Sequence, residues 1–463
     1  MVLCLSFLKI VRNSLFKEGV FGRDDHTSSF LLGDTMKLSK YSRLIPCDSK
    51  WILFNSTNKA VVLLDSRLVD SDKLIDDALS TEEQQTLRSF GFFLDDKEAE
   101  AQARHSFSDS ARLSLSIELS LDCNLRCPYC YQGNKHRGDT IKSEHLNQVK
   151  SWLISKITDG SYREIVIKVL GGEPALHWQV ADGFLRDIAS LCSQYDTRFV
   201  LMIDTNATII EPFKGIDYVE KLLFTIPLSH RSCHDEVRKD AAGDGTYDKI
   251  ISNIKKLKKV YPDCVIVLRH NTDDSNVGLF ADYLEELKKS GIENPYVDIT
   301  YTANFETNSH KNKLVYREYL DWRMQTALPL LVEYGFPVLI SPVMNPGPCQ
   351  NVERSSFKLF SDGTVGYCAM DFFSKNRQPL TEALLPESLF FKGKLTLPET
   401  CYSCGSFFLC GGSYYLPCIR SLGVENCEKD GAFNVDLEKF LQTYVRTSRK
   451  NLFVVFNQNE LVR

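Results

Sequence analysis

The chain has no run of 18 apolar residues and almost no net charge. The first absence excludes a hydrophobic transmembrane helix, which needs about 20 predominantly apolar residues. The formal charge is −5, from 55 Lys and Arg against 60 Asp and Glu, which argues against nucleic-acid or acidic-membrane binding through bulk basicity. No internal repeat or low-complexity tract stands out. At 463 residues and 43% hydrophobic content, the chain is long enough for about three globular domains.

The N-terminus lacks the features of a secretion signal. Residues 1–21 contain an apolar stretch, but Lys9 interrupts it and no small-residue cleavage site follows. We therefore give residues 1–35 no functional weight, expect them to be poorly ordered, and place the start of the first domain at Met36. The expected location is a reducing cytoplasm, where clustered cysteines are more often metal ligands than disulfides.

Strand and helix patterns divide the rest of the chain. Residues 36–97 read as a small α+β unit with strands at 51–54 and 60–64 and a helix starting at Ser80, followed by a polar linker at 98–112. Beyond it, strands alternate with amphipathic helices, which argues for a parallel sheet or barrel with its site at the carboxyl ends of the strands. Six strands are expected in this region, at 113–121, 165–170, 199–203, 222–226, 265–268 and 297–301. A helix at 311–334 is expected to close it.

Cysteine is abundant, with 15 residues, most of them in two groups. Cys123, Cys127 and Cys130 follow the first strand as Cys-x3-Cys-x2-Cys, and three thiolates on one loop can ligate one metal centre. The spacing alone leaves an iron–sulfur cluster and a zinc site completed by His136 or His145 equally open.

This run resembles the cluster loop of the radical S-adenosylmethionine (radical SAM) superfamily, with Tyr129 at the aromatic position before the last cysteine. The resemblance implies that the three cysteines ligate a [4Fe–4S] cluster whose fourth iron is chelated by SAM. One-electron reduction then cleaves SAM into methionine and a 5′-deoxyadenosyl radical, which abstracts hydrogen from a substrate. The implied one-electron donor is a protein such as flavodoxin or ferredoxin.

Further matches lie where the predicted strands end. Residues 171–174 resemble the family's Gly-Gly-Glu-Pro motif, and residues 205–206 its Thr-Asn-Gly, although Ala207 replaces the glycine. At the fourth strand, residues 225–229 depart from the usual Ser-Ile-Asp-Gly, while a His-Asp pair and Arg238 follow at the expected offsets. The residues that the resemblance implies for SAM binding are Tyr129, Gly171, Gly172, Glu173, Pro174, Thr205, Asn206, Arg238 and Arg269. Without the cysteines, the glycine pair would be an ordinary turn and Arg269 a solvated strand end.

The second cysteine group resembles the SPASM extension of radical SAM enzymes, which carries auxiliary clusters. The resemblance implies one auxiliary [4Fe–4S] cluster on Cys401, Cys404, Cys410 and Cys427. It implies a second cluster on Cys349, Cys368 and a further cysteine. The position expected for that cysteine is occupied by Tyr414, and the next cysteine along the chain is Cys418. Either Cys418 takes that role or the second cluster has an open site. A structural zinc site on part of this group is the plain alternative.

The predicted fold is therefore α/β: a partial (β/α)6 radical SAM barrel at 106–335, a small α+β unit with linker at 36–105, and a loop-rich SPASM domain with a C-terminal helix at 336–463. The 36–105 unit resembles the N-terminal region of peptide maturases, in which a leader peptide adds a strand to a sheet edge. We expect an oxidoreductase that cross-links a side chain of a ribosomally made peptide or protein through carbon or sulfur. No nucleic-acid or membrane partner is expected.

Two alternatives stay open. A sulfatase-maturating enzyme would oxidise Ser or Cys to formylglycine, and Asp371, three residues after Cys368, is the candidate general base. A zinc-stabilised peptide-binding protein without catalysis would explain the cysteines as folding staples.

Overall fold

The computed structural model describes residues 8–11, 37–58, 60–75, 78–108, 112–132, 140–304, 309–339, 356–367, 377–385, 388, 397–410, 432–447 and 454–455. Several predicted site residues lie outside the described residues: Cys349, Cys368, Asp371, Cys418 and Cys427. The side chain of Cys410 also lies outside them.

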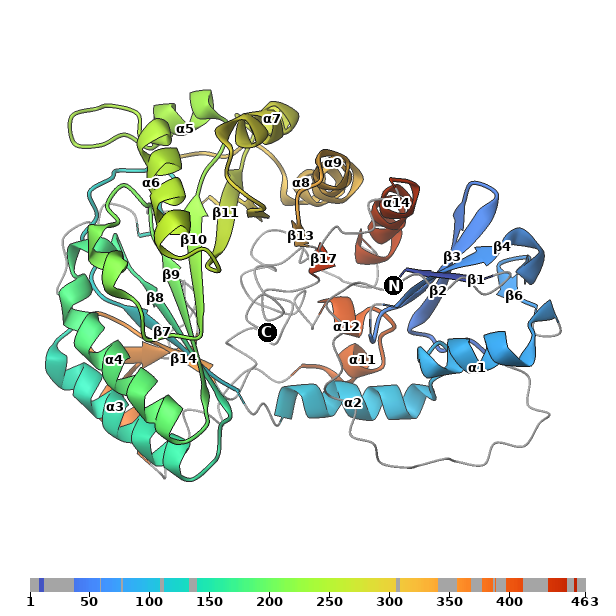
Figure 1. The fold of residues 1–463 in the computed structure, drawn as a ribbon, viewed down its shortest axis with the longest axis horizontal. Helices are drawn as coiled ribbons and strands as arrows, with labels where there is room; N and C mark the ends of the chain where they lie inside the picture. Colours follow the sequence, from blue (N-terminus) through green and yellow to red (C-terminus); the bar gives the residue numbers. More distant parts are fainter. Residues whose placement is uncertain are drawn as a thin grey trace.

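A mostly parallel sheet organises the larger part of the molecule (Figure 1). Its central strands are the six that were predicted, in sequence order: β7 (Arg112–Glu118), β8 (Glu164–Leu170), β9 (Arg198–Asp204), β10 (Lys221–Pro227), β11 (Val265–Thr272) and β12 (Tyr296–Tyr301). Each pairs in parallel with the next. Their carboxyl ends therefore meet at one edge, where the predicted site residues follow the strands. The closure of this sheet into a partial barrel stays a prediction.

Helices connect these strands, because parallel neighbours need crossovers. The longer ones are α3 (Ser143–Thr158), α4 (Trp178–Gln194), α6 (Tyr247–Val260) and α7 (Phe280–Ser290). Shorter ones are η3 (Pro174–Leu176), η4 (Glu211–Gly215), α5 (Arg231–Val237) and η5 (Val277–Leu279). After β12 come α8 (Tyr316–Trp322), the π-helical η6 (Arg323–Ala327) and α9 (Leu328–Tyr334). The predicted helix at 311–334 therefore begins five residues later.

The two faces of the sheet have different characters, as alternation along a strand requires. On β8, Ile165 and Ile167 belong to the large core shared with α3 and α4. Val166 belongs to a small apolar cluster with Val200, Leu223 and Val267 on the opposite face. Toward the strand ends this second face becomes charged, with Lys168, Asp204, Arg269 and Asp298 in register with the apolar positions.

Elements from the tail extend the sheet at both ends. On the β7 side lie β14 (Ser356–Leu359), parallel to β7, then β15 (Thr364–Gly366) and β16 (Gln378–Pro379); on the β12 side lie β13 (Val338–Leu339) and β17 (Val454–Val455). A buried ion pair joins β14 to β7, with Lys358 Nζ 2.7 Å from Glu118 Oε2. The tail helices are α10 (Leu380–Ala383), α11 (Glu399–Tyr402), α12 (Phe407–Cys410) and α14 (Ala432–Arg446).

The N-terminal unit is a separate antiparallel sheet in the order β1-β4-β3-β2. Its strands are β1 (Leu8–Val11), β2 (Ser42–Cys47), β3 (Lys50–Asn55) and β4 (Val61–Asp65). After them come, in chain order, η1 (Ser66–Leu68), β5 (Val69–Asp70), β6 (Lys73–Leu74), α1 (Thr81–Ser89) and α2 (Asp96–Ser108). The predicted helix start is confirmed: Ser80 and Glu83 form a capping box.

Two expectations for the N-terminal region are corrected. The segment 98–112, expected to be a polar linker, is largely the helix α2, which Asp95 caps by accepting from the Lys97 and Glu98 amides. Its alanines and glutamates are strong helix formers, and the polar character of the segment as a whole concealed this. Within residues 1–35, expected to be poorly ordered, Leu8–Val11 pairs with β4 as β1.

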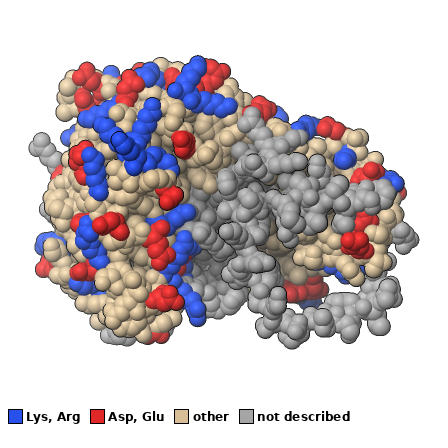
Figure 2. Space-filling view, in the orientation of Figure 1, with Lys and Arg blue, Asp and Glu red and all other residues tan. Residues whose placement is uncertain are grey.

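Charged residues of both signs intermingle over the visible face of the part that contains the parallel sheet (Figure 2). Lysines gather on α6, where Lys249, Lys255, Lys256 and Lys259 are exposed. Among the described residues, no helix combines the length and apolarity needed to cross a bilayer.

Candidate functional site

The three-cysteine loop begins directly after β7, at the carboxyl edge of the sheet. Cys123, Cys127 and Cys130 are all half-buried. The loop turns tightly, with the Cys130 amide donating to the Cys127 carbonyl at 3.1 Å. The Leu125 amide points at Cys123 Sγ from 3.4 Å. Burial raises the pKa of the Cys123 thiol to about 11, so ligation of a metal there would release a proton.

The glycine pair after β8 holds this loop by backbone contact. The Gly172 amide donates to the Ser120 carbonyl at 2.9 Å, and the Glu173 amide donates to the Asp122 carbonyl at 2.7 Å. A Cβ atom on Gly172 would lie 2.0 Å from the Asp122 carbonyl oxygen. Glycine is therefore required here by the cysteine loop itself, whatever contact the turn makes with SAM.

Glu173 is a buried latch between two strand ends. Its carboxylate accepts from Thr205 Oγ1 and the Asn206 amide, both at 2.7 Å, and from the Ala175 amide at 3.0 Å. Burial raises the pKa of Glu173, while these three donors oppose the shift. Its side chain is 2% exposed, so it acts on the site by fixing the turn after β9.

That turn reaches the cysteine loop through Asn206. The side-chain nitrogen Nδ2 of Asn206 donates to Asn124 Oδ1 at 2.8 Å and lies 3.8 Å from Cys123 Sγ. Asn124 in turn donates to Thr208 Oγ1 at 2.8 Å. Ala207, which replaces the expected glycine, adopts a left-handed φ of +56°. The turn keeps the glycine-like backbone even though the residue has changed.

On the opposite side of the loop stands Arg238, which is 4% exposed. Its Nη1 lies 3.1 Å from Tyr129 Oη and 3.6 Å from Cys127 Sγ. His234, in the expected His-Asp pair, donates to Thr246 Oγ1 at 3.1 Å, and Thr246 donates to the Arg238 carbonyl at 2.7 Å. His234 therefore supports the Arg238 backbone through Thr246.

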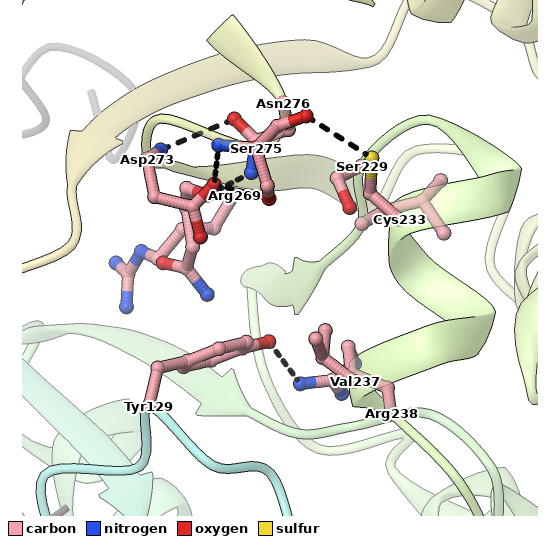
Figure 3. A pocket seen from close by; sticks show the side chains of 11 residues that line it. Tyr129, Ser229, Cys233, Val237, Arg238, Arg269, Asp273, Ser275 and Asn276 are labelled. Atoms are coloured by element: carbon pink, nitrogen blue, oxygen red, sulfur yellow. Dashed lines mark hydrogen bonds between the residues drawn. The ribbon is translucent and has the colours of Figure 1, made fainter. Parts of the chain in front are cut away.

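A small pocket opens between the cysteine loop and α5 (Figure 3). Tyr129 enters it from the loop, Arg238 from the end of α5 and Arg269 from β11. Arg269 is held by Asp298, 3.1 Å from its Nε, and faces Asp204 at 3.8 Å. Two cations beside one pocket suit a ligand that carries a carboxylate.

The chemistry of the first cysteine group fits an iron–sulfur cluster. Cys123 and Cys127 sulfurs each face N–H donors, and Arg238 adds a positive charge, which suits a cluster bound by several thiolates. Among the described residues, no three His, Cys, Asp or Glu side chains converge closely enough to share one metal ion.

Of the two histidines considered as a fourth zinc ligand, the structure describes only His145. His145 packs its ring against Gly363 in the tail, where a Cβ would lie 2.3 Å from the ring. His136 lies outside the described residues.

The second cysteine group is described only at Cys401 and Cys404. Cys401 is buried and Cys404 is exposed. The Cys404 amide donates to the Cys401 carbonyl at 3.1 Å, and the Ser406 amide points at Cys404 Sγ from 3.5 Å. A tight Cys-x2-Cys turn with an N–H facing sulfur suits a metal or cluster ligand pair.

The structure brings most of the described predicted residues into one neighbourhood around the cysteine loop: Tyr129, Gly171, Gly172, Glu173, Pro174, Thr205, Asn206, Arg238 and Arg269. Sequence reasoning missed Asn124, His177 and His310. His177 Nε2 lies 2.9 Å from Asp122 Oδ2, and the His310 amide donates to the Pro128 carbonyl at 3.1 Å. The position of Asn124 inside the cysteine run was the one available signal.

Comparisons with known proteins agree with this geometry. Residues 117–277 match the family model of the radical SAM superfamily. The chain therefore contains a radical SAM domain, and this domain supports an oxidoreductase activity.

One curated protein and several solved structures are also similar to this chain. A cysteine-type anaerobic sulfatase-maturating enzyme from Clostridium novyi (strain NT) is 28% identical over 289 residues, covering 56% of this chain and 74% of the relative. The solved structure of native anSMEcpe with bound AdoMet and Cp18Cys peptide covers 73% of this chain and 100% of its own, with TM-score 0.53 and 17% identity. Streptococcus suis SuiB aligns over 80% of this chain and 94% of its own at TM-score 0.45 and 16% identity.

Proposed function

We propose that this enzyme uses a SAM-derived radical to oxidise a side chain of a ribosomally made peptide or protein, forming a carbon–carbon or carbon–sulfur cross-link. The observation that carries the proposal is the cysteine loop itself, whose sulfurs face Asn206 and Arg238 beside a pocket with two arginines. The sulfatase-maturating relative supports a peptide or protein substrate.

Cys123, Cys127 and Cys130 would hold the [4Fe–4S] cluster, and Tyr129, Arg238 and Arg269 would contact SAM. The cluster and SAM, when bound, would supply a 5′-deoxyadenosyl radical. The protein's residues then have two tasks. Arg238 and the side-chain amide of Asn206 would stabilise negative charge on the sulfurs, and the buried Glu173 latch would fix the loop so that the pocket keeps its shape.

Two further [4Fe–4S] clusters are proposed in the tail, one on Cys401, Cys404, Cys410 and Cys427 and one on Cys349, Cys368 and Cys418. Such clusters supply one-electron transfer. A cross-link removes two hydrogens from the substrate, one as an atom and one as a proton, so one electron also leaves the substrate and needs an acceptor. The Cys401–Cys404 turn supports this proposal, since Cys404 Sγ already faces a backbone N–H.

The substrate is proposed to be recognised by the N-terminal unit. An antiparallel sheet can accept a peptide as an additional edge strand through main-chain hydrogen bonds. In this chain β4 already accepts one additional strand, β1, with Leu8 opposite Leu64 and Val11 opposite Val61.

The one-electron donor is proposed to approach α6. Asn253 of α6 donates to the Ala207 and Thr208 carbonyls at 2.9 and 3.2 Å, and this turn contacts the cysteine loop. The exposed lysines of α6 therefore lie over the turn behind the cysteine loop, where a negatively charged donor would be attracted.

Formylglycine formation is the second candidate, favoured by the Clostridium novyi relative. The two reactions differ in their products. Oxidation of cysteine to formylglycine removes the sulfur and leaves an aldehyde, whereas a cross-link leaves no aldehyde and a carbon–sulfur cross-link keeps the sulfur.

The test is anaerobic reconstitution followed by measurement of iron, sulfide, zinc and 5′-deoxyadenosine. About 12 irons per chain with SAM cleavage are expected for three four-iron clusters. Replacing Cys123, Cys127 and Cys130 with alanine is expected to abolish cleavage and to leave the tail iron in place. Zinc with little iron, or cleavage by the triple variant, would contradict the assignment. Aldehyde capture on modified peptides then separates the two candidate reactions.

A further inference from the structure

The N-terminal sheet lies directly against the Cys401–Phe408 segment of the tail, which is remote in sequence. Tyr41 Oη donates to the Tyr402 carbonyl at 3.0 Å, and Ser56 Oγ donates to the Gly405 carbonyl at 3.0 Å. At Gly405 the two chains are so close that a Cβ would lie 2.5 Å from the Lys40 carbonyl oxygen. The backbone of the Cys401–Cys404 turn is therefore held from outside the tail.

A side chain of the same sheet reaches the sulfur of this turn. Arg43 on β2 donates from Nη2 to Ser406 Oγ at 2.7 Å. The Ser406 amide in turn points at Cys404 Sγ from 3.5 Å. The charge of Arg43 interacts with Cys404 and, from α14, with Glu438. Arg43 thus brings a partly buried positive charge to the cysteine that faces outward.

The contact is built into the alternation of the sheet. Ile45 and Cys47 on β2, with Ile52 and Phe54 on β3, belong to the core that also contains Cys401, Phe407, Phe440 and Leu441 of the tail. Residues of the opposite parity, Leu53 and Val62, pack with Leu87 of α1 in a separate cluster. Arg43 has the parity of the tail-facing set, so its direction follows from the pleat.

We infer that the N-terminal unit is a structural part of the auxiliary cluster site, with Arg43 as a positioning residue that orders the Ser406–Cys404 turn and places positive charge beside the cluster. This inference rests on the proposed function, because the cluster on Cys401 and Cys404 is itself a proposal. Partners that orient metal ligands strongly affect metal retention, and a cation beside a cluster favours its reduced, more negative state. The unit proposed to recognise the substrate would thereby also tune the tail cluster.

The experiment isolates the tail iron in a Cys123→Ala, Cys127→Ala, Cys130→Ala background. Iron and sulfide, the rate of iron loss to a chelator, and the midpoint potential by spectroscopic redox titration are measured on the full chain. Arg43→Gln is expected to speed iron loss about tenfold and to lower the potential. Arg43→Lys keeps the charge and is expected to keep the potential near that of the background. The matched control is Arg67→Gln, in η1 of the same unit, which is expected to change neither quantity.

The possible results distinguish the role of Arg43 from the presence of the auxiliary cluster. Tail iron that responds to Arg43→Gln no more than to Arg67→Gln overturns the inference alone. Absence of iron from the triple-cysteine background overturns the auxiliary-cluster proposal and this inference with it. If Arg43→Gln fails to fold, Ser406→Ala decides: it removes the hydroxyl that Arg43 bonds and is expected to speed iron loss, and an unchanged rate overturns the inference.

Discussion

At the scale of single residues, the site is held by contacts that leave no room for small changes. Gly172 is the sharpest case, since an added Cβ would lie 2.0 Å from the backbone oxygen of Asp122. Backbone atoms cannot swing aside as a flexible side chain can. Gly172→Ala is therefore expected to displace the cysteine loop and to cost about 1–3 kcal/mol of stability.

The measurements for Gly172→Ala are iron per chain and 5′-deoxyadenosine formation, the latter falling about tenfold or more. Gly183→Ala in α4 is the matched control, since nothing lies within 4 Å of its added Cβ. That control is expected to stabilise the protein by about 0.4–1 kcal/mol. Equal behaviour of the two variants would show that the glycine contact is dispensable.

A buried histidine gives the protein a defined acid sensitivity. His270 is fully buried, bonds Thr272 Oγ1 through Nδ1 at 2.9 Å, and packs against Phe280 and Tyr283. Burial lowers the pKa of His270 from 6.5 to about 3. Between these values the unfolded chain binds a proton that the folded chain does not. Stability is therefore expected to fall as pH drops below about 6.5, by up to about 1.4 kcal/mol per pH unit from this group.

The check on His270 is the unfolding midpoint across that pH range. His270→Asn keeps an acceptor or donor for Thr272 and removes the titration, so its midpoint is expected to fall less steeply than that of the parent chain. Some slope remains, because burial also lowers the pKa of His234. Parallel curves for the two chains would contradict the prediction.

At the scale of elements, one buried ion pair docks a tail strand onto the radical SAM sheet. Lys358 and Glu118 are 1% and 6% exposed, and Glu118 also accepts from Ser361 Oγ at 3.1 Å. Lys358→Met leaves the carboxylate buried without its cation and is expected to cost about 3–5 kcal/mol. Adding Glu118→Gln is expected to recover part of that loss.

Thermal unfolding of the single and double variants measures this coupling. Arg446→Met is the control, because its pair with Asp48 is exposed on both sides and solvent screens it. We expect no measurable change in that variant. A Lys358→Met variant as stable as Arg446→Met would show that β14 does not depend on the pair.

The lysines of α6 make the proposed donor surface testable. Lys255→Glu with Lys256→Glu is expected to slow reduction by a negatively charged protein donor about tenfold at low salt, and less at high salt. Reduction by dithionite is expected to be unchanged. Lys288→Glu with Lys289→Glu on α7 is the control, as both lysines are exposed. Equal donor rates in the two double variants would rule out α6 as the docking surface.

The sequence predicted elements well wherever the pattern was local. The strands β7 to β12 were found because apolar runs of strand length alternated with helical periods. The parallel pairing of β14 with β7 was not found, because it joins Ser356 to Ser114, which lie far apart in the sequence, and no local period records it. The cysteine spacing identified the candidate loop, but the Glu173 latch and the Arg43 contact depend on which side chains the folded sheets bring together.

At the scale of the whole molecule, the N-terminal unit packs against the tail and does not form a separate domain. One face of its sheet shares the main core with the tail, through Ile45, Ile52 and Phe54. Gln442 of α14 donates to the Pro46 carbonyl at 2.7 Å, and Arg104 of α2 bonds Glu399 at 2.9 Å. The division at residue 105, expected from the sequence, therefore falls between parts that share one apolar core.

This packing predicts that the two fragments of a cleaved chain stay bound to each other. A specific protease site inserted between Ser108 and Arg112 is expected to give two fragments that co-elute in gel filtration, at low and at high salt. Apolar burial is not screened by ions, so salt removes only contacts such as Arg104–Glu399. Replacing the buried Phe54 with aspartate before cleavage places an unpaired charge in the shared core and is expected to release the N-terminal fragment. Fragments that separate without that substitution would show that the shared core does not hold the two parts together.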